Sequence, residues 1–481
     1  MEELLKYDIW KYFYQITQIP RPSKKEEKIA SFLLDFAKVH GLEAESDKAG
    51  NVIIRKKASA GRENLPGVIL QSHMDMVCEK NSDKDHDFDK DPIEIYIEDG
   101  WVKARGTTLG GDDGIGIAAS LAILASDEIE HGPLECLFTS DEETGMTGAF
   151  GLQPGFIKGS ILLNLDSEDE GELFIGCAGG IDTTAEFTWK PEMAPQESYA
   201  CKISVSGLNG GHSGDDIDKG LGNSNKILVN FLNILQHKTD LKISDLNGGN
   251  LRNAIPREAF AIICIPSEDK EIVRKELNIY ASLVENEFKL TEKNLKVDLD
   301  SVSLPEMVID SSTQKNLIKS LVDCPHGVIA MSQSIKGLVE TSTNLASVKF
   351  RDGNKILVAT SQRSSDSNSI KEISAKVAGI FANAGAKTIQ GEGYPGWSPN
   401  INSEILKITE NAYKRLFGLK PKVKAIHAGL ECGLFLTKYP NLDMVSFGPT
   451  IKGAHSPDER MEIKSVQKFW DLLVEVLKNI H

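Results

Sequence analysis

The run Val68-Ile69-Leu70-Gln71-Ser72-His73-Met74-Asp75 joins an apolar segment to a histidine and an aspartate. Residues 67–71 predict a buried β-strand, and His73 and Asp75 come just after it. In an open α/β sheet, functional sites form at the carboxyl ends of the strands. Residues i and i+2 of an extended segment point the same way, so Asp75 can accept a hydrogen bond from His73 and fix its tautomer. A histidine and an aspartate at this spacing more often lie on the surface without a function. The other motifs therefore determine whether this pair belongs to a site.

A glycine-rich acidic motif, Gly110-Gly111-Asp112-Asp113-Gly114, precedes a helix that we expect over residues 115–125. This helix is apolar on nearly every side, which predicts that it is buried. The glycine pattern resembles a phosphate-binding loop, but two aspartates at the position of the phosphate make anion binding unfavourable. A carboxylate that bridges two metal ions fits the charge, while Asp113 could as easily be only a helix N-cap.

A second acidic cluster, Asp141-Glu142-Glu143, follows a predicted strand at residues 134–139. Three adjacent acids repel one another unless a cation is close, so the cluster belongs either to a solvated loop or to a metal site. The apolar strand before it favours a position at the rim of the sheet. Neighbouring glutamates can then divide the work, since one can bind a metal while the other takes a proton from water.

Two further candidate ligands are Asp166, which follows a predicted strand at residues 161–165, and His455, which lies in the late segment 448–457. With the motifs above they form a set of imidazole and carboxylate groups without a thiolate, which suits a pair of divalent metals used for hydrolysis. Six other histidines lack a comparable context, and we interpret them as surface or structural residues: His40, His86, His131, His237, His326 and His427.

The composition is typical of a soluble globular protein, with 481 residues, 40% hydrophobic and 26% charged residues and a net charge of −16. No basic stripe is present, which argues against nucleic acid and anionic membranes as partners. The N-terminus lacks the pattern of a signal peptide, and no apolar run reaches the roughly 18 residues of a membrane span. Seven scattered cysteines without a CxxC pair suggest reduced thiols, so we expect a cytoplasmic protein.

The length predicts two or more domains, and strands that alternate with helices predict an α/β fold. We expect a first domain formed by residues 1–185 and 395–481, interrupted by an inserted α/β lid domain at residues 186–394. The linker-like segment 189–195 lies near the first boundary. If His455 is to meet His73, the two outer parts of the chain must form one domain.

Two local patterns predict finer detail. Within the expected lid, a polar turn, a strand and a helix follow one another at residues 249–288 and again at 341–384, which suggests an internal duplication. Chance similarity between any two βα units is the alternative explanation. Near the N-terminus, Ser23 and Glu26 have the spacing of a capping box for a helix over residues 24–40.

Taken together, the motifs resemble those of the co-catalytic metallopeptidase family that includes dipeptidases, aminoacylase-type deacylases and glutamate carboxypeptidase, and within it the aminoacyl-histidine dipeptidases. The phrases that carry the resemblance extend from residue 71 to residue 460: QSHMDMV, RGTTLGGDDGIG, DEETGMTGA, NLDSEDEGEL, GLNGGHSG, GGNLRNAIPRE, HAGLECG and GPTIKGAHSPDER. The metal motifs are shared across the wider family, whereas the lid phrases and the C-terminal phrase are more specific. The resemblance implies a mixed-sheet di-zinc peptidase domain interrupted by a lid.

The resemblance also implies a ligand set for two divalent metal ions, zinc first, with cobalt or manganese as alternatives. Asp112 bridges the two ions. His73 and Asp166 complete one site, and Glu143 and His455 complete the other. The peptide bond between Asp112 and residue 113 is expected to be cis.

Five further residues receive roles from the resemblance. Asp75 orients the first histidine ligand, and Glu142 is the general base and later the acid. In the lid, His212 stabilises the oxyanion, while Asn253 and Arg363 bind the C-terminal side of the substrate. These roles are chemically sensible, because a planar guanidinium suits a carboxylate.

The resemblance implies metal-dependent hydrolysis of dipeptides, Xaa-His and broader, by a metal-bound water. Expected partners are a small peptide substrate and at most a second copy of the chain, as a monomer or homodimer. One alternative is an N-acyl amino-acid deacylase on the same fold. Another is a non-catalytic peptide-binding protein, which would be expected to lose Glu142 or a ligand, and this chain has lost none.

Overall fold

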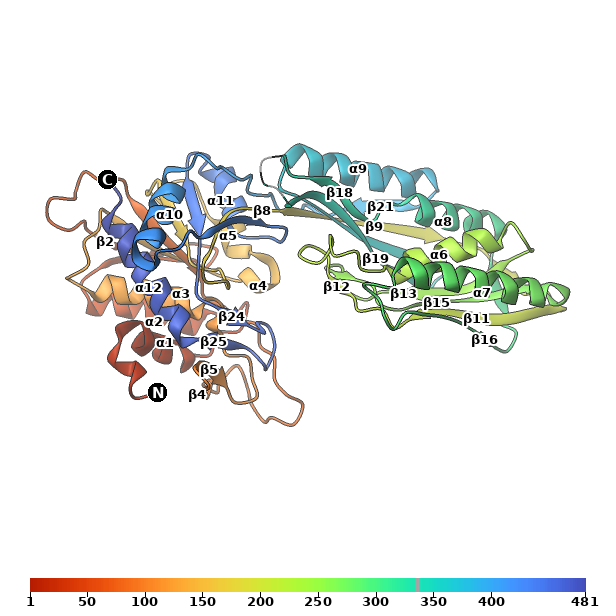
Figure 1. The fold of residues 1–481 in the computed structure, drawn as a ribbon, viewed down its shortest axis with the longest axis horizontal. Helices are drawn as coiled ribbons and strands as arrows, with labels where there is room; N and C mark the ends of the chain where they lie inside the picture. The colour runs from red at the N-terminus through yellow and green to blue at the C-terminus, as the bar shows by residue number, and fades with distance from the viewer. Residues whose placement is uncertain (334, 336) are drawn as a thin grey trace. The chain divides into compact units, whose positions relative to one another are not determined.

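The computed structural model describes residues 1–333, 335 and 337–481, and the chain folds into two compact units (Figure 1). The first unit comprises Met1–Gly176, Trp397–Ala425 and Leu430–His481. The second comprises Cys177–Gly396 and the short return Ile426–Gly429. The first unit is therefore built from segments far apart in the sequence, with the second inserted between them.

An eight-stranded mixed sheet organises the first unit. In spatial order its strands are β1 (Glu43–Ser46), β2 (Val52–Lys56), β6 (Leu134–Thr139), β3 (Val68–His73), β7 (Ile161–Asn164), β23 (Asp443–Ser446), β8 (Glu172–Cys177) and β22 (Lys422–Ile426). The neighbours β6, β3, β7 and β23 run parallel, whereas β1, β2 and β8 run antiparallel to their partners. This mixed topology confirms the predicted α/β class.

The parallel strands determine where the acidic motifs lie. His73 pairs with Thr139 across β3 and β6, and Gln71 pairs with Asn164 across β3 and β7. The three strands are fully buried or nearly so, which agrees with their continuous apolar runs. Because parallel strands end at the same edge, the polar residues that follow them gather there.

Helices and a small sheet complete the first unit. The helices are η1 (Leu4–Lys6), α1 (Asp8–Thr17), α2 (Glu27–Val39), α3 (Gly111–Ala125), α4 (Glu142–Gly145), α5 (Thr147–Gly151), α10 (Glu404–Phe417), α11 (Cys432–Lys438) and α12 (Ile463–Lys478). The small sheet has the order β24 (Ile451–Lys452), β25 (Arg460–Glu462), β5 (Trp101–Ala104) and β4 (Ile95–Glu98). Helix α3 is buried along almost its whole length, as its apolar sequence predicts, and packs on α1 and β3.

The second unit is an antiparallel sheet with helices on one face (Figure 1). Its strands follow the order β16 (Lys296–Ser301), β11 (Ser198–Ser206), β15 (Ala259–Pro266), β13 (Lys242–Gly248), β19 (Val339–Arg351), β20 (Lys355–Ser364), β9 (Gly179–Thr188) and β21 (Lys387–Gln390), and β18 (Gly327–Met331) pairs with β19. The covering helices are α6 (Ser224–Leu235), α7 (Lys270–Glu287), α8 (Ser311–Asp323) and α9 (Ser367–Asn383). Side chains of the sheet and all four helices form one hydrophobic core.

Shorter elements complete the second unit. Strand β12 (Gly211–His212) pairs with β14 (Ala254–Ile255), and β10 (Pro191–Met193) pairs with β17 (Met307–Ile309). The turn η2 (Ser267–Asp269) precedes α7. The lid function of this unit and its internal duplication stay predictions.

The predicted capping box at the start of α2 is wrong. The N-cap is Glu26, and its side chain makes no capping hydrogen bond. Oε1 of Glu26 instead accepts from the backbone N–H groups of Lys24 and Asp141, while Ser23 donates to Asp75. Tertiary partners compete with the local motif here, because buried carboxylates elsewhere in the unit need these donors.

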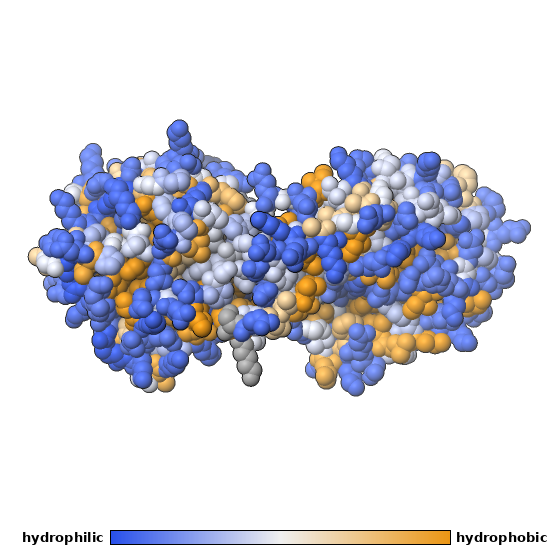
Figure 2. Space-filling model, turned by 90° about the horizontal axis from the view of Figure 1, so that it is seen from above, coloured by the Kyte–Doolittle hydropathy of each residue, from blue (hydrophilic) through white to orange (hydrophobic). Residues whose placement is uncertain are grey.

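Hydrophilic residues cover most of the face shown in Figure 2, with hydrophobic residues scattered between them, as expected for a chain with 26% charged residues. None of the helices in the described part of the chain combines the length and the apolar character that a membrane span requires.

The core of the second unit provides a test of the fold. Phe381 of α9 is fully buried, and its ring meets that of Phe187 edge-on at 6.3 Å. We expect Phe381→Ala to lower the local free energy of unfolding by about 3–5 kcal/mol, because it leaves a cavity. Native-state hydrogen exchange over β9 and β20 measures this loss. Ile389→Ala is the control, since Ile389 is 57% exposed. A loss below about 1 kcal/mol for Phe381→Ala would contradict this packing.

Candidate metal centre and active site

Asp112 lies between two histidines that come from opposite ends of the chain. Its Oδ1 lies 2.9 Å from Nε2 of His73, and its Oδ2 lies 3.2 Å from Nε2 of His455. His73 ends β3, Asp112 lies in the first turn of α3, and His455 follows β24. The peptide bond between Asp112 and Asp113 is cis, as the resemblance implies. A carboxylate whose oxygens face two separate imidazoles is suited to bridge two metal ions.

Asp166 and Glu143 complete two groups of candidate ligand atoms. Oδ1 of Asp166 lies 3.5 Å from Nε2 of His73, and Oε2 of Glu143 lies 3.0 Å from Nε2 of His455. Within the group of His73, Asp112 and Asp166, and within that of Asp112, Glu143 and His455, the donor atoms lie within 4.8 Å of one another. The structure thus brings together the five residues that the sequence predicts as ligands.

The electrostatics of these groups fit divalent cations. Oε1 of Glu143 is buried and has no hydrogen-bond partner among the described residues. Burial and the nearby charge of Asp112 raise the pKa of Asp166 well above its usual value. Hydrogen bonds with Asp112 and Glu143 raise the pKa of His455 to about 11. The cluster therefore favours positive charge, which metal ions would supply to this nitrogen and oxygen donor set.

Asp75 connects His73 to the turn that carries the two glutamates. Nδ1 of His73 lies 3.1 Å from the carbonyl oxygen of Asp75 and 3.4 Å from its Oδ1. The carboxylate accepts from the backbone N–H groups of Glu142 and Glu143 at 3.0 and 3.2 Å, and from Oγ of Ser23 at 2.7 Å. Burial opposes the ionisation of Asp75, but hydrogen bonds with His73 and these donors lower its pKa to about 2. Asp75 therefore stays an anion that orients its neighbours.

Glu142 begins α4 beside the candidate ligands. Its side chain is half-buried, and one of its oxygens lies within 4.8 Å of donor atoms of His73 and Glu143. Burial, with the charges of Asp166 and Glu431, raises the pKa of Glu142 well above its usual value. A carboxylate of raised pKa beside a metal site can take a proton from water and later release it.

Glu459 fixes the turn that precedes α3. Its two oxygens accept from the backbone N–H groups of residues 109–111 at 2.7, 3.0 and 2.8 Å. The side chain is only 3% exposed. Since Glu459 lies four residues after His455, one C-terminal segment supplies a candidate ligand and also holds the backbone next to Asp112.

Arg21 supports the same turn from the N-terminal side. Its guanidinium donates to the carbonyl oxygens of Met74 at 3.0 Å, Asp75 at 2.5 Å and Gly110 at 2.5 Å. Like Glu459 it is almost completely buried. The segment after β3 and the turn before α3 therefore share one cation.

Glu431 holds the ends of the central strands together. Its Oε2 accepts from Nε2 of Gln71 at 2.7 Å and from Oγ1 of Thr139 at 2.6 Å. Gln71 in turn accepts from Nδ2 of Asn164 at 2.6 Å. This buried network joins β6, β3 and β7 directly below the candidate ligands, and burial raises the pKa of Glu431 to about 7.

Arg21, Glu459 and Glu431 were not predicted from the sequence as site residues. Each is a charged residue in a short polar or glycine-rich phrase that lies outside a helix or strand. Arg21 stands between two prolines, and the other two belong to the phrases HAGLECG and GPTIKGAHSPDER. A charged residue within such a phrase is the sequence signal that could have identified them.

In the second unit, Ser213 links the three residues that the resemblance assigns to substrate. Its backbone N–H donates to the carbonyl oxygen of Asn253 at 2.8 Å, and its Oγ accepts from Nε of Arg363 at 3.4 Å. His212 directly precedes it in β12, with its Nδ1 accepting from the N–H of Asp215 at 3.2 Å. These three residues therefore form one cluster within this unit.

Two residues beside Arg363 were not assigned to this cluster from the sequence. Nη1 of Arg363 donates to the hydroxyl of Tyr394 at 3.0 Å. His427 is 6% exposed and its Nε2 lies 2.8 Å from Oγ of Ser342. Burial and the charge of Arg363 lower the pKa of His427 to about 4, so this imidazole is neutral at pH 7. His427 was interpreted as a surface or structural residue, and its buried position fits the structural alternative.

Comparison with known proteins identifies the family of the chain. The model of peptidase family M20/M25/M40 matches residues 69–479. The chain is 46% identical to the cytosol non-specific dipeptidase of Escherichia coli (strain K12) over 480 residues, which cover 100% of this chain and 99% of that protein.

Solved structures extend the comparison. An aminoacylhistidine dipeptidase from Vibrio alginolyticus superimposes with a TM-score of 0.91 and 45% identity, over 98% of this chain and 96% of that one. A tripeptidase from Staphylococcus aureus has a TM-score of 0.56 at 18% identity over 98% of both chains, which shows a shared fold. From the near full-length family match and the extensive identity, we conclude that the chain belongs to peptidase family M20/M25/M40.

Proposed function

We propose that this chain hydrolyses dipeptides with the help of two divalent metal ions, zinc first, with cobalt or manganese as alternatives. The observation that carries the proposal is the carboxylate of Asp112, with one oxygen beside His73 and the other beside His455. The names of the Escherichia coli and Vibrio alginolyticus relatives support dipeptides as substrates. Xaa-His dipeptides are therefore the first substrates to test.

His73, Asp112 and Asp166 would hold one ion, and Asp112, Glu143 and His455 would hold the other. When bound, the ions would polarise the scissile carbonyl group and lower the pKa of water. A similar donor set without a thiolate is common at hydrolytic metal sites.

Glu142 then acts as the proton carrier. It takes a proton from the attacking water and passes it to the amine that leaves. Its half-buried position and raised pKa support this role, because a base must hold the proton long enough to transfer it. Asp75 keeps His73 in one orientation throughout.

The cluster of the second unit binds the other end of the substrate. Arg363, with Asn253, binds the free carboxylate of the dipeptide, and His212 donates a hydrogen bond to the developing oxyanion. These roles require the second unit, of this chain or of another copy, to act as a lid that brings the cluster to the metals. The enzyme works in the cytoplasm as a monomer or homodimer, without nucleic acid or membrane partners.

Metal content tests the bridging role of Asp112. We expect two divalent ions per chain under saturating zinc, and about one or none in Asp112→Asn, because a neutral amide is a poor bridge. Elemental analysis of the dialysed protein measures the stoichiometry. Asp127→Asn is the control, since Asp127 is exposed just past the other end of α3. Two retained ions in Asp112→Asn would show that the bridge lies elsewhere.

Two neighbouring glutamates provide a matched test of the proton carrier. Glu142→Gln should lower kcat for an Xaa-His dipeptide by about 10²–10⁴-fold and leave both ions bound, because only proton transfer is lost. Glu143→Gln should instead release metal, since Oε2 of Glu143 faces His455. Kinetics and elemental analysis are measured on the same samples. If Glu142→Gln kept a tenth of wild-type turnover, the assignment would be wrong.

Substrates with a free or an amidated C-terminus test whether Arg363 binds the substrate carboxylate. The free dipeptide should be cleaved far better than its C-terminal amide, and Arg363→Ala should remove most of this preference by raising KM for the free acid. The ratio of kcat/KM for acid and amide is compared between wild type and variant. Arg252→Ala is the control, because Arg252 is exposed and pairs with Asp182. Equal cleavage of acid and amide by the wild type would rule out carboxylate recognition. Cleavage of N-acetyl amino acids instead of dipeptides would identify a deacylase and overturn the proposal.

A further inference from the structure

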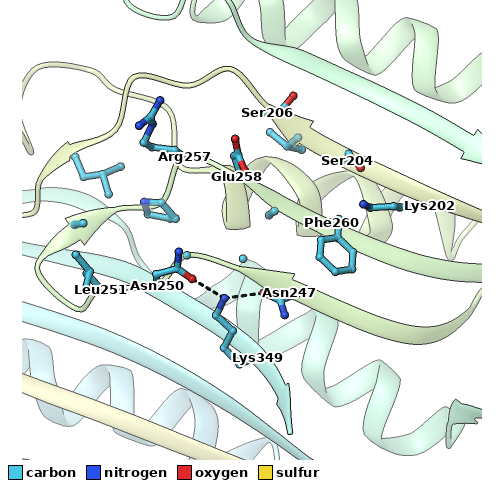
Figure 3. A pocket seen from close by; sticks show the side chains of 17 residues that line it. Lys202, Ser204, Ser206, Asn247, Asn250, Leu251, Arg257, Glu258, Phe260 and Lys349 are labelled. Carbon is cyan, nitrogen blue, oxygen red and sulfur yellow. Dashed lines mark hydrogen bonds between the residues drawn. The ribbon is translucent and has the colours of Figure 1, made fainter. Parts of the chain in front are cut away.

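A cavity of about 650 Å³ opens on the sheet of the second unit, on the face that the helices leave free (Figure 3). Ile203 and Val205 of β11 belong to the core under the helices. Successive side chains of a strand point to opposite faces, so Lys202 and Ser204 point to the free face, where they line the cavity. Strands β11, β13, β15 and β19 form its floor, and the segment 249–257 forms one wall.

Three cations line this cavity without a carboxylate partner. Lys202, Arg257 and Lys349 form no ion pair within the part of the chain that the structure describes. Other cations of the same unit do pair, since Arg252 meets Asp182 and Lys355 meets Glu186. The cavity thus concentrates positive charge in a chain whose net charge is −16.

Neutral groups satisfy the cations instead. Nζ of Lys349 donates to the amide oxygens of Asn247 at 2.7 Å and Asn250 at 2.9 Å, as Figure 3 shows. Nζ of Lys202 lies 4.5 Å from the centre of the Phe260 ring. Neutral partners compensate a desolvated cation less well than an anion does.

Acids lie nearby, but within the described residues none forms an ion pair with these cations, not even Asp300, which is opposite Lys202 in the pairing of β11 with β16. Glu258 lines the cavity without an ion pair in the described residues. Asp245 interacts with Lys349 over a longer distance, yet burial still lowers the pKa of this lysine. Lys349 therefore remains a partly buried cation that an anion would stabilise.

Apolar side chains also line the cavity. Leu251, Ile255 and Pro256 come from the segment 249–257, and the ring of Phe260 lies beside Lys202. The volume lies within the range of about 300–1,000 Å³ that is usual for small-molecule sites, and it exceeds the need of an inorganic ion. A ligand that complements both the cations and the apolar side chains has an acidic group and an apolar body.

We propose that this cavity binds a small organic anion, with its phosphate or carboxylate group between Lys202 and Lys349 and its apolar part against the ring of Phe260. This site goes beyond the proposed dipeptide hydrolysis, and all its residues belong to the second unit. The anion accepts the hydrogen bond that Lys349 now donates to Asn250. It therefore also contacts the segment 249–257, which carries Asn253.

Isothermal titration calorimetry of the metal-loaded full chain tests the site with four probes. Phenyl phosphate and benzoate carry an acidic group on an apolar ring, inorganic phosphate lacks the ring, and benzyl alcohol lacks the charge. We expect phenyl phosphate or benzoate to bind with one site per chain and at least about tenfold more tightly than the other two. The tighter of the two ring acids identifies the preferred acidic group.

Variants locate the binding site. Lys349→Met, and independently Lys202→Met if the first variant does not fold, should weaken the ring acid by about tenfold or more. Lys355→Met is the control, because Lys355 lies on the same sheet and pairs with Glu186. If a probe bound at the candidate metal ligands instead, its affinity would be unchanged in these variants. Unchanged affinity in both lysine variants, equal binding of benzyl alcohol, or no binding of either ring acid at about 10 mM would overturn the proposal.

Discussion

Repulsion between buried carboxylates is the constraint on which the rest of this site depends. Glu143 and Asp166 each have a carboxylate oxygen within 4.8 Å of one of Asp112, at the edge of the sheet where the parallel strands end. Such a cluster is costly unless positive charge offsets it. The two histidines alone cannot remove this cost, because Oε1 of Glu143 still lacks a partner in the described part of the chain. Two divalent ions would neutralise the cluster, which explains why the charges are concentrated here.

The chain keeps these charges in place with buried polar groups from distant segments. Arg21 comes from the N-terminal region and Glu459 from the C-terminal region, and both hold the turn before α3. Glu431 joins β3 and β6 below the ligands. Such supports orient the candidate ligands without binding a metal themselves, so their loss would be expected to lower metal affinity or activity. The same reasoning applies to Ser213, which aligns Arg363 with the backbone of Asn253.

The sequence was sufficient to predict the strands and to single out the acidic and histidine residues that follow them, because both follow local rules. Residues 67–71 are continuously apolar and end in a histidine, so strand and site are visible in a few residues. The supports were not visible, because Glu459 acts on backbone N–H groups about 350 positions away. The capping box failed for the same reason, since Ser23 finds a better partner in Asp75 than in its own helix. Long-range polar pairing leaves little trace in local patterns.

The central claim is that Asp112 bridges two metal ions. Anomalous diffraction at the zinc edge, on crystals of the zinc-loaded protein, tests it most directly. The account predicts two anomalous peaks about 3.5–4 Å apart, one near each oxygen of Asp112, with His73 at the first peak and His455 at the second. A single peak, or two peaks that Asp112 does not join, would contradict it.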